Sequence, residues 1–431
     1  MKKSMIKPLA VIFLILAAAG VFLRLVELES RDPWIKSAAG DILGPELAFQ
    51  AGDSGKGLKS LRVEGIQGDT TAEIWAGQVP PGTRETEKKI ALRPLPKGLK
   101  DGPILLRIIA VDRSWNGGNT SVFEKKTVID TKPPRLTILG GPHYVNQGGA
   151  GCLAYTTDET AASSGILVGG VEFRGFAQEG NRGLTLYALG HGVPADVSFQ
   201  AAVSDLVGNK ASLAFRPVVK PKSFKKDSIA ISDRFLADVL PCFKERDASL
   251  QGSDVDVFLA VNRDQRRKDS ETIQVACRES APQALWSGPF LRLPNSKPMA
   301  AYGDERSYLY QGAEIDKQIH LGVDLASLAQ SKIPAANAGR VLFAGSLGIY
   351  GETVILDHGL GLASLYAHLS RIDVEVGRDV ARGETLGLTG STGMAGGDHL
   401  HFAMLVQGVF VNPVEWWDAH WIRDNVELKM K

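Results

Sequence analysis

Five of the eight histidines in this chain of 431 residues lie between positions 320 and 401. The intervals are short and even, because His320 and Asp324 are four residues apart and His399 and His401 are two apart. Side chains alternate between the two faces of a β-strand, so an even interval places both members of a pair on one face. A short apolar run, Phe402 to Val406, follows His401 and favours a strand there. The stretch therefore predicts strands that present imidazoles and a carboxylate on the same side of a sheet.

Two imidazoles and one carboxylate make the three-ligand set of a catalytic zinc ion, which leaves a fourth position open for water. A further histidine, His368, lies between the two pairs. The stretch thus holds more imidazoles than zinc needs, and the surplus can act as acid, base or oxyanion donor. A structural zinc site is the alternative, but such sites are closed by four protein ligands, often cysteines. None of the three cysteines falls in this stretch, so a catalytic metal site is favoured.

Three motifs in this stretch carry a family resemblance: His320-Leu-Gly-Val-Asp324, Tyr366-Ala-His368-Leu-Ser370 and His399-Leu-His401. In this order they resemble the lysostaphin-type, or LytM-like, zinc metalloendopeptidases of bacterial cell walls, over about residues 319–417. The resemblance implies that His320, Asp324 and His401 bind Zn²⁺ and that His368 and His399 are catalytic. His399 would be the base that orients the water, and His368 the donor to the oxyanion or the leaving amine. The reverse assignment of these two roles stays open.

The same resemblance implies the reaction: hydrolysis of peptide bonds in peptidoglycan stems or cross-links, through a zinc-bound water whose pKa falls to about 7. The chain has no His-Glu-x-x-His helix, so histidines must take the place of the usual glutamate base. Regulatory relatives lack one or more of the five site residues, whereas this chain has all five. Two alternatives stay open: a membrane-tethered, non-catalytic activator of another cell-wall hydrolase, and a secreted protease that acts on proteins.

The N-terminus predicts export from the cytoplasm. Lys2, Lys3 and Lys7 precede an uncharged stretch from Leu9 to Leu23, which is the pattern of an export signal. An uncleaved transmembrane anchor over residues 1–28 is favoured, and a cleaved signal peptide is the alternative. The lysines would stay inside, which predicts a single-pass inner-membrane protein whose catalytic domain faces the periplasm or cell wall. A formal net charge of +1 gives no electrostatic case for a nucleic acid, so peptidoglycan and the membrane are the expected partners.

The rest of the chain predicts a mainly β protein with several domains. Residues 44–134 and 135–220 alternate short strand-like segments with turns, and each resembles an immunoglobulin-like β-sandwich. Each segment holds a strand that ends in an aspartate and is soon followed by an asparagine: Asp112 with Asn119, and Asp205 with Asn209. Spacer modules are favoured over glycan-binding modules. Residues 286–425 are expected to form the antiparallel β peptidase domain, with successive strands at 340–344, 353–356 and 362–366.

A small helical insert is predicted between these domains, at residues 227–285. Ser232 is expected to cap a helix that stops at Pro241, and a second helix is expected to start at Ser253. The second helix leads into a basic segment, residues 263–268, which by default is a solvated helix end. Cys242 and Cys277 are expected to pair outside the cytoplasm and to leave Cys152 alone.

Overall fold

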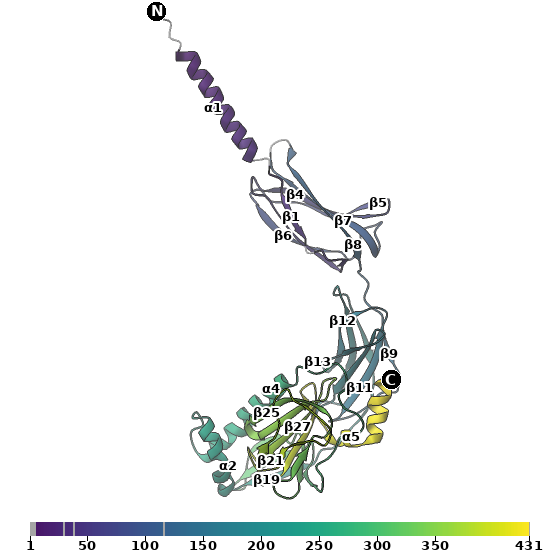
Figure 1. Cartoon of the computed structure of the whole chain (residues 1–431), viewed down its shortest axis with the longest axis vertical. Coiled ribbons are helices and arrows are strands. Elements are labelled where there is room, and N and C mark those ends of the chain that lie inside the picture. The colour runs from purple at the N-terminus through teal and green to yellow at the C-terminus, as the bar shows by residue number, and fades with distance from the viewer. Residues whose placement is uncertain (1–5, 29–30, 38, 115–116, 431) are drawn as a thin grey trace, which may run out of the picture. The chain divides into compact units, whose positions relative to one another are not determined.

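The computed structural model describes residues 6–28, 31–37, 39–114 and 117–430, and it gives residues 6–10 and 23–28 by their backbone alone. The chain divides into two compact units (Figure 1). Unit 1 comprises Met1–Pro133 and Ser204–Lys210, and unit 2 comprises Pro134–Val203 and Ala211–Lys431. The mainly β architecture that the sequence predicts is confirmed.

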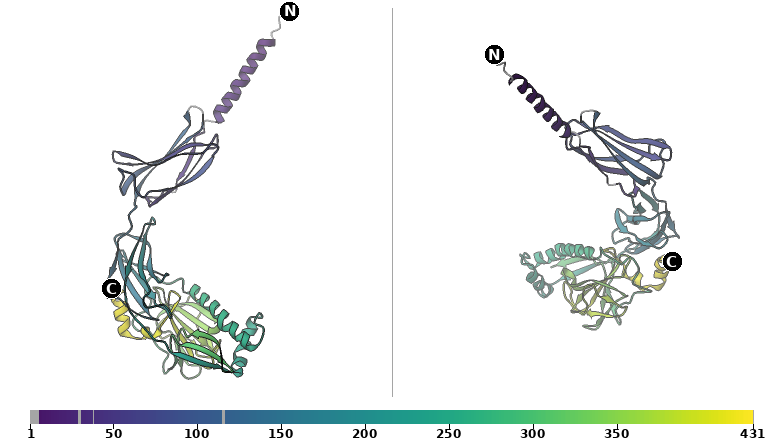
Figure 2. Two further views of the ribbon diagram at one scale, coloured as in Figure 1. Left: turned by 180° about the vertical axis from the view of Figure 1, so that it is seen from behind. Right: turned by 45° about the horizontal axis from the view of Figure 1, so that its top comes forward.

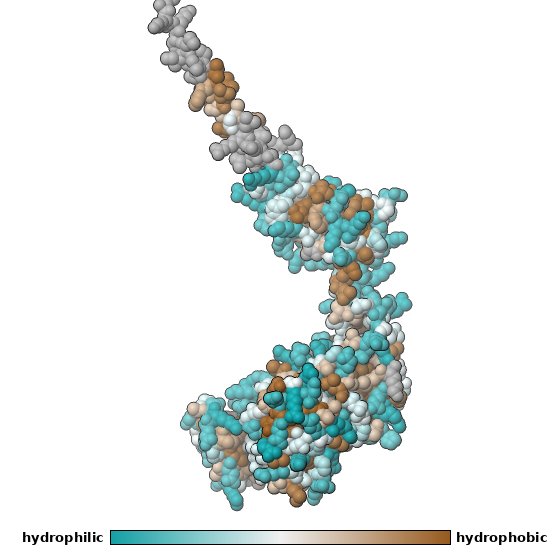
Figure 3. All heavy atoms as spheres, viewed as in Figure 1, coloured by the Kyte–Doolittle hydropathy of each residue, from teal (hydrophilic) through white to brown (hydrophobic). Residues whose placement is uncertain are grey.

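Unit 1 begins with helix α1 (Ile6–Leu28). Its described side chains, residues 11–22, are exposed and largely apolar (Figure 3). Among the described residues, no helix combines the length and the hydropathy that are needed to cross a membrane. The predicted transmembrane anchor over residues 1–28 stays a prediction, and its residues 1–5 lie outside the described part.

The remainder of unit 1 consists of two sheets. The first has the order β1 (Trp34–Ser37), β3 (Glu46–Gly52), β6 (Glu85–Ala91), and the second the order β2 (Ile42–Leu43), β8 (Thr120–Ile129), β7 (Gly102–Asp112), β4 (Leu58–Gln67), β5 (Thr70–Gln78). Along β7 every second residue from Ile104 to Ala110 is buried, as expected for a strand with one face on the core. This alternation explains why the strand could be read from the sequence.

Unit 2 opens with two sheets of four strands each and a short parallel pair. The sheets have the orders β14 (Phe176–Gln178), β15 (Arg182–Ala188), β11 (Ala150–Thr157), β9 (Leu136–Leu139) and β13 (Val171–Arg174), β12 (Ala161–Val168), β16 (Phe199–Asp205), β17 (Lys210–Phe215); the pair is β10 (Tyr144–Asn146) with β18 (Val218–Lys220). The predicted aspartate–asparagine repeat is confirmed. Asn119 Nδ2 donates to Asp112 Oδ2 (3.0 Å), and Asn209 Nδ2 donates to Asp205 Oδ2 (2.7 Å).

The helical insert starts with strand β19 (Lys226–Ile231) and helix α2 (Asp233–Arg246). Ser232 caps α2 as predicted, because its side chain accepts a hydrogen bond from the backbone of Phe235. The predicted stop at Pro241 is wrong, since the helix continues to Arg246. Val239, before the proline, and Phe243, after it, are both buried, and this packing outweighs the backbone hydrogen bond that proline removes.

The second helical segment has three parts: α3 (Asp254–Ala260), a π-helical turn η2 (Val261–Gln265) and α4 (Arg266–Ala276). Ser253 and Asp256 form a reciprocal capping box at its start, which confirms the predicted helix start. The π-helical turn overlaps the segment that the sequence marks only as basic, residues 263–268. Such turns are rare and occur most often at functional sites.

The predicted disulfide is wrong, because all three cysteines are free thiols. Cys242 lies inside α2, where its Sγ donates to the backbone oxygen of Val239 at 3.0 Å. Cys277 is the buried C-cap of α4, and Cys152 is buried in β11. Two cysteines in one insert were not sufficient evidence for a bond, because pairing depends on the direction of both Cβ atoms.

The peptidase region contains three sheets. An edge sheet has the order β19, β21 (Glu305–Tyr310), β22 (Ala313–Ile319). The main sheet of eight strands has the order β20 (Lys297–Ala300), β23 (Val323–Ala326), β31 (Leu400–Val406), β27 (Leu362–Leu369), β26 (Gly351–Asp357), β25 (Gly339–Leu347), β29 (Asp379–Val380), with β32 (Val409–Val411) on β31. The third sheet has the order β24 (Lys332–Pro334), β30 (Thr385–Leu388), β28 (Arg371–Ile372). Strands β25, β26 and β27 cover the three predicted segments and confirm them.

Helical segments flank the peptidase sheets. The insert lies on one side, and α5 (Pro413–Trp417), α6 (Ala419–Ile422), π-helical η4 (Arg423–Glu427) and α7 (Leu428–Met430) lie on the other (Figure 1, Figure 2). One continuous hydrophobic core runs from the first sheets of unit 2, with Cys152 and Tyr155, into the peptidase region, with Leu325 and Trp416. The Glu415 carboxylate bridges the two regions. The site described next is therefore built on a rigid β scaffold within one unit.

Candidate active site

Two neighbouring strands and one bend bring the predicted metal ligands together. Asp324 on β23 is the direct cross-strand partner of His401 on β31. His320 does not lie on a strand, as the even spacing predicted, but in the bend that joins β22 to β23. The bend turns the chain from the edge sheet into the main sheet. His320 reaches Asp324 because of this turn and not through alternation along one strand.

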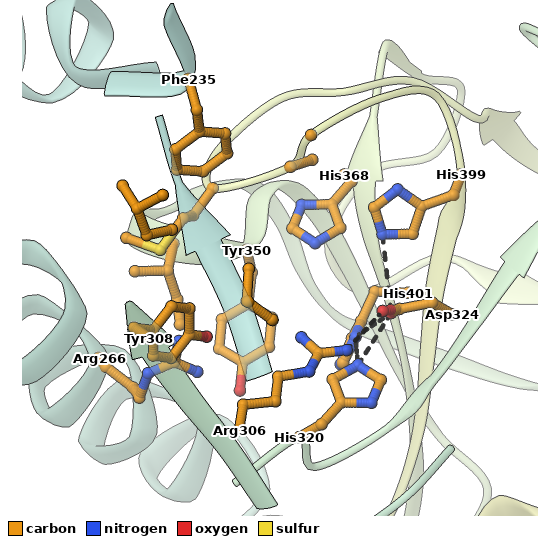
Figure 4. Close-up of a pocket in the computed structure, with 16 residues that line it drawn as sticks. Phe235, Arg266, Arg306, Tyr308, His320, Asp324, Tyr350, His368, His399 and His401 are labelled. Atoms are coloured by element: carbon orange, nitrogen blue, oxygen red, sulfur yellow. Dashed lines mark hydrogen bonds and ion pairs between the residues drawn. The ribbon is translucent and has the colours of Figure 1, made fainter. Parts of the chain in front are cut away.

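Three lone-pair atoms from these residues converge on one point (Figure 4). His320 Nε2 is 2.9 Å from Asp324 Oδ1 and 3.0 Å from His401 Nδ1, and His401 Nδ1 is 2.9 Å from Asp324 Oδ1. A tetrahedral zinc ion with bonds of about 2.0–2.1 Å separates its ligand atoms by about 3.3 Å. The triangle is thus slightly contracted, and its size and its donor types fit a zinc ion.

The surroundings of the triangle hold the ligands in the protonation states that a metal needs. His320 Nδ1 donates to the backbone oxygen of Ala301 at 2.9 Å, so the neutral ring leaves Nε2 bare. Arg306 Nη2 donates to Asp324 Oδ2 at 3.1 Å and occupies the carboxylate oxygen that the triangle does not use. Burial lowers the pKa of His401 to about 4. Burial alone would raise the pKa of Asp324, but its contacts with His320, His399 and His401 hold it well below its usual value.

The two predicted catalytic histidines lie beside the triangle. The His368 and His399 rings are 4.8 Å apart between centroids, and the His368 and His401 rings are 5.8 Å apart. His368 Nδ1 donates to the backbone oxygen of Thr392, and His399 Nδ1 to that of Gly397, both at 2.8 Å. Each neutral ring therefore keeps Nε2 free to accept a proton. His368 also holds a φ of 65°, a left-handed conformation that is uncommon outside glycine and is often found at functional sites.

The electrostatic environments of these two histidines differ. Burial lowers the pKa of His368 to about 3, and among the described residues no carboxylate lies within ion-pair distance of its ring. His399 Nε2 lies 3.6 Å from Asp324 Oδ1. Burial alone would lower the pKa of His399, but the Asp324 contact outweighs burial and raises it. The structure thus favours a neutral His368 and a His399 that holds a second proton more readily.

All five residues line a pocket of about 300 Å³. The helical insert and the strands before the first motif supply the other wall, through Ile229, Ile231, Phe235, Arg266, Arg306 and Tyr308. Sequence reasoning missed the two arginines and Tyr350, whose ring lies 5.6 Å from that of His401. Arg306 and Tyr308 are two residues apart on β21, and the same even-spacing argument could have placed them on one face.

The sequence of this region matches the model of peptidase family M23 over residues 318–413. Residues 318–413 are an M23 peptidase domain. The domain is 39% identical over 97 residues to the DD-carboxypeptidase/endopeptidase Mpg of Neisseria meningitidis, a match that covers 22% of each chain. It is 34% identical over 96 residues to the peptidoglycan DD-endopeptidase ShyA of Vibrio cholerae, again over 22% of each chain. It is also 36% identical over 95 residues to the murein hydrolase activator EnvC of Escherichia coli, over 22% of this chain and 23% of that protein. The chain therefore spans about a fifth of the length of these curated relatives.

The remaining histidine of the M23 domain, His358, has a structural role. His358 Nδ1 donates to the backbone oxygen of Ala338, and its Nε2 bonds to Ser364 Oγ, both at 2.7 Å. Ser364 Oγ also hydrogen-bonds to the hydroxyl of Tyr366 at 2.9 Å, and that hydroxyl accepts a hydrogen bond from the backbone nitrogen of Ala336 at 2.8 Å. This buried hydrogen-bond chain fixes the backbone of β27, which carries His368 at its far end.

Proposed function

We propose that this chain is a zinc-dependent endopeptidase that hydrolyses peptide bonds in peptidoglycan. The observation that carries the proposal is the convergence of His320 Nε2, Asp324 Oδ1 and His401 Nδ1 within 3.0 Å of one another, beside two further histidines in one pocket. Two relatives add the substrate class, because Mpg is a DD-carboxypeptidase/endopeptidase and ShyA is a peptidoglycan DD-endopeptidase.

A zinc ion, when bound, supplies a Lewis acid for the scissile carbonyl and an acidified water for the attack. His320, Asp324 and His401 would hold that ion. Arg306 keeps Asp324 oriented by binding its second oxygen, and Ala301 keeps Nε2 of His320 bare. These contacts fix the ligands before the metal arrives, which lowers the cost of assembling the site.

We propose that His368 accepts the proton from the attacking water and that His399 donates to the oxyanion or the leaving amine. His368 presents a bare Nε2, because Thr392 holds the proton on its Nδ1. His399 is the histidine that lies beside the Asp324 carboxylate, which favours a second proton on its ring. This is the reverse assignment that the sequence leaves open.

Two alternative functions are less well supported by the site. The first alternative is a non-catalytic activator. EnvC, a murein hydrolase activator, matches the same domain at 36% identity, so sequence similarity alone does not distinguish an enzyme from an activator. The complete set of five residues, with two histidines that a structural role does not need, favours an enzyme. A protease that acts on proteins is the second alternative, and the test below includes casein to address it.

We also propose a place and an arrangement for the activity. Peptidoglycan lies in the cell envelope, so the enzyme would act there. The β-sheets of unit 1 and the first sheets of unit 2 would be immunoglobulin-like spacer modules. Among the described residues they contain no second cluster that matches the catalytic one.

Five alanine variants test the proposal. His320→Ala, Asp324→Ala and His401→Ala each remove a ligand and should lose both bound zinc and activity. His368→Ala and His399→Ala should keep zinc and lose turnover by about 10²–10⁴-fold, the usual worth of one acid–base group. The measurements are zinc per chain and the release of new amino groups from purified sacculi.

His420→Ala is the matched control, since His420 is exposed on α6, outside the site; it should keep both zinc and activity. Casein should not be cleaved. An inactive wild-type chain that binds zinc but stimulates a second hydrolase would support the activator instead. Full activity in any of the five variants would remove that residue from the site.

A further inference from the structure

The helical insert places an arginine in the active-site pocket, outside the residues that match the M23 family. Arg266 is the first residue of α4 and lines the pocket together with Tyr308. In Figure 4 it lies at the end of the pocket opposite His320 and Asp324. Neither the zinc triangle nor the two catalytic histidines contact it, so the proposed reaction does not account for its presence.

Arg266 is held in a fixed orientation. Its Nε donates to the backbone oxygen of Asn262 at 3.1 Å, and its Nη2 donates to the side-chain oxygen of Asn262 at 2.7 Å. Asn262 is fully buried, and its own Nδ2 donates to Asp316 Oδ2 at 2.7 Å. Asn262 lies within the π-helical turn that ends at Gln265, and Arg266 follows that turn directly. A long side chain that is clamped in this way loses little further entropy when it binds a ligand.

The clamp uses neutral acceptors only. Among the described residues, no carboxylate lies within ion-pair distance of Arg266. The acidic groups around it already have partners. Asp316 pairs with Arg263 at 2.9 Å, and Asp324 pairs with Arg306 at 3.1 Å. Asp269, whose charge also acts on Arg266, accepts hydrogen bonds from Gln265 and from the backbone of Ile349. Arg266 is half-buried, and a cation that is partly removed from water with no carboxylate in direct contact is unfavourable. An anion that enters the pocket would remove that cost.

The pocket is electropositive even without a metal. Arg266 and Arg306 both line it, against the single carboxylate of Asp324. Arg306 Nε is buried and has no hydrogen-bond partner among the described residues. Guanidinium groups bind carboxylates through paired N–H donors, so a peptide that carries a free carboxylate near the scissile bond fits this lining better than a neutral peptide does.

We infer that Arg266 is a specificity-determining residue that binds a free carboxylate of the substrate peptide. This inference rests on the proposed peptidase function, because it concerns the same pocket. The carboxylate has two possible sources: the C-terminal carboxylate of a stem peptide, or the free carboxylate of an acceptor residue inside a cross-link. Recognition by Arg266 would link the insert, which lies outside the family match, to the choice of bond.

Binding of non-hydrolysable peptides tests the inference without relying on turnover. Four probes are needed, each with the scissile amide replaced by a methylene-amine: a stem peptide and a cross-linked peptide, each with its carboxylate free or converted to a carboxamide. Affinity is measured by calorimetry on the zinc-loaded full chain. The wild type should bind at least one carboxylate probe about 10- to 100-fold more tightly than its carboxamide, as expected for a charge-assisted hydrogen bond.

Arg266→Gln should abolish this preference, and Arg266→Lys should recover part of it by restoring the charge. Arg267→Gln is the matched control, because Arg267 is the next residue, is exposed and pairs with Glu271; it should keep the full preference. The probe that shows the effect identifies the source of the carboxylate. A preference that persists in Arg266→Gln, or no preference in the wild type, would overturn the inference.

The outcome is separate from that of the proposed function. A wild type that cleaves sacculi but binds all four probes equally would keep the peptidase and reject the role of Arg266. A wild type that leaves sacculi intact, but prefers the carboxylate in an Arg266-dependent way, would keep the binding site and reject the peptidase. Thermal unfolding of each variant shows that the change in affinity does not reflect loss of the fold.

Discussion

Gly322 lies between the first two metal ligands, and replacing it with alanine should displace the third. A Cβ atom at this position would lie 2.5 Å from both Cε1 and Nε2 of His401 and 2.8 Å from the backbone oxygen of Phe402. Ordinary contacts between carbon atoms are about 3.5–4.0 Å, so the imidazole would have to withdraw by about 1 Å. The ring has little room to do so, because Tyr350 and His320 lie at centroid distances of 5.6 and 4.9 Å.

The expected losses follow from that displacement. Moving a ligand out of its orientation typically costs 10- to 100-fold in metal affinity, and a misplacement of about 1 Å in an active site costs about 10²-fold in rate. Overpacking should also reduce the free energy of unfolding by about 1–3 kcal/mol. Gly322→Ala should therefore bind zinc weakly while remaining folded.

The assay is competition for zinc against a chelator of known affinity, together with the rate on sacculi at saturating zinc. Gly190→Ala is the control, since the nearest heavy atom to a Cβ there, Val409 Cγ1, is at an ordinary 3.4 Å. Unchanged zinc affinity in Gly322→Ala would refute the reasoning, because it would show that Gly322 does not set the position of His401 or that His401 is not a ligand.

Two further predictions concern stability and redox state. Burial raises the pKa of Glu415 to about 7 from 4.5, so the native state binds a proton that the unfolded state releases, and stability should fall as pH rises between these values. The expected loss of unfolding free energy is on the order of 3 kcal/mol, at about 1.36 kcal/mol per pKa unit. Urea midpoints at pH 4.5 and 7.5 should show that Glu415→Gln removes this part of the loss. Equal pH dependence of stability in both proteins would contradict the prediction. Thiol titration of the denatured chain without reductant should find Cys152, Cys242 and Cys277 all free, and a linked Cys242–Cys277 peptide would contradict the structure.

The sequence was informative where a feature depends on near neighbours in the chain. Ser232 and Ser253 mark helix starts because a cap bonds to a backbone group two or three residues away. The strand at Leu362–Leu369 was readable from its apolar run and its turn residues. The metal triangle was predictable in composition, although the spacing argument placed His320 on a strand that in fact ends one residue earlier.

The features that were missed depend on distant parts of the chain. Arg266 looks like a solvated helix end until Asn262 is seen to contact Asp316, 54 residues further along. Pro241 looks like a helix stop until the burial of both flanks is known. The left-handed φ of His368 has no sequence signal, because the residue is not a glycine. In each case tertiary packing overrides the local preference.

The bridge made by Glu415 bears on how this enzyme can be rearranged by recombination or by design. Asn146 Nδ2 and the backbone nitrogen of Ala150 donate to its two carboxylate oxygens at 2.6 and 2.9 Å, although they precede it by more than 260 residues. A graft that moved only the family-matched residues 318–413 into a foreign scaffold would cut through one shared core and discard Glu415 altogether.

In the original chain, such a graft would leave Asn146 Nδ2 and the backbone nitrogen of Ala150 without the acceptor that Glu415 provides. The transplanted part would expose an apolar face. A transplanted piece that keeps this core closed must carry the first sheets of unit 2 together with the M23 domain. Swapping the M23 domain among relatives therefore requires exchanging its preceding β-sheets with it, so that substrate choice and scaffold are inherited together.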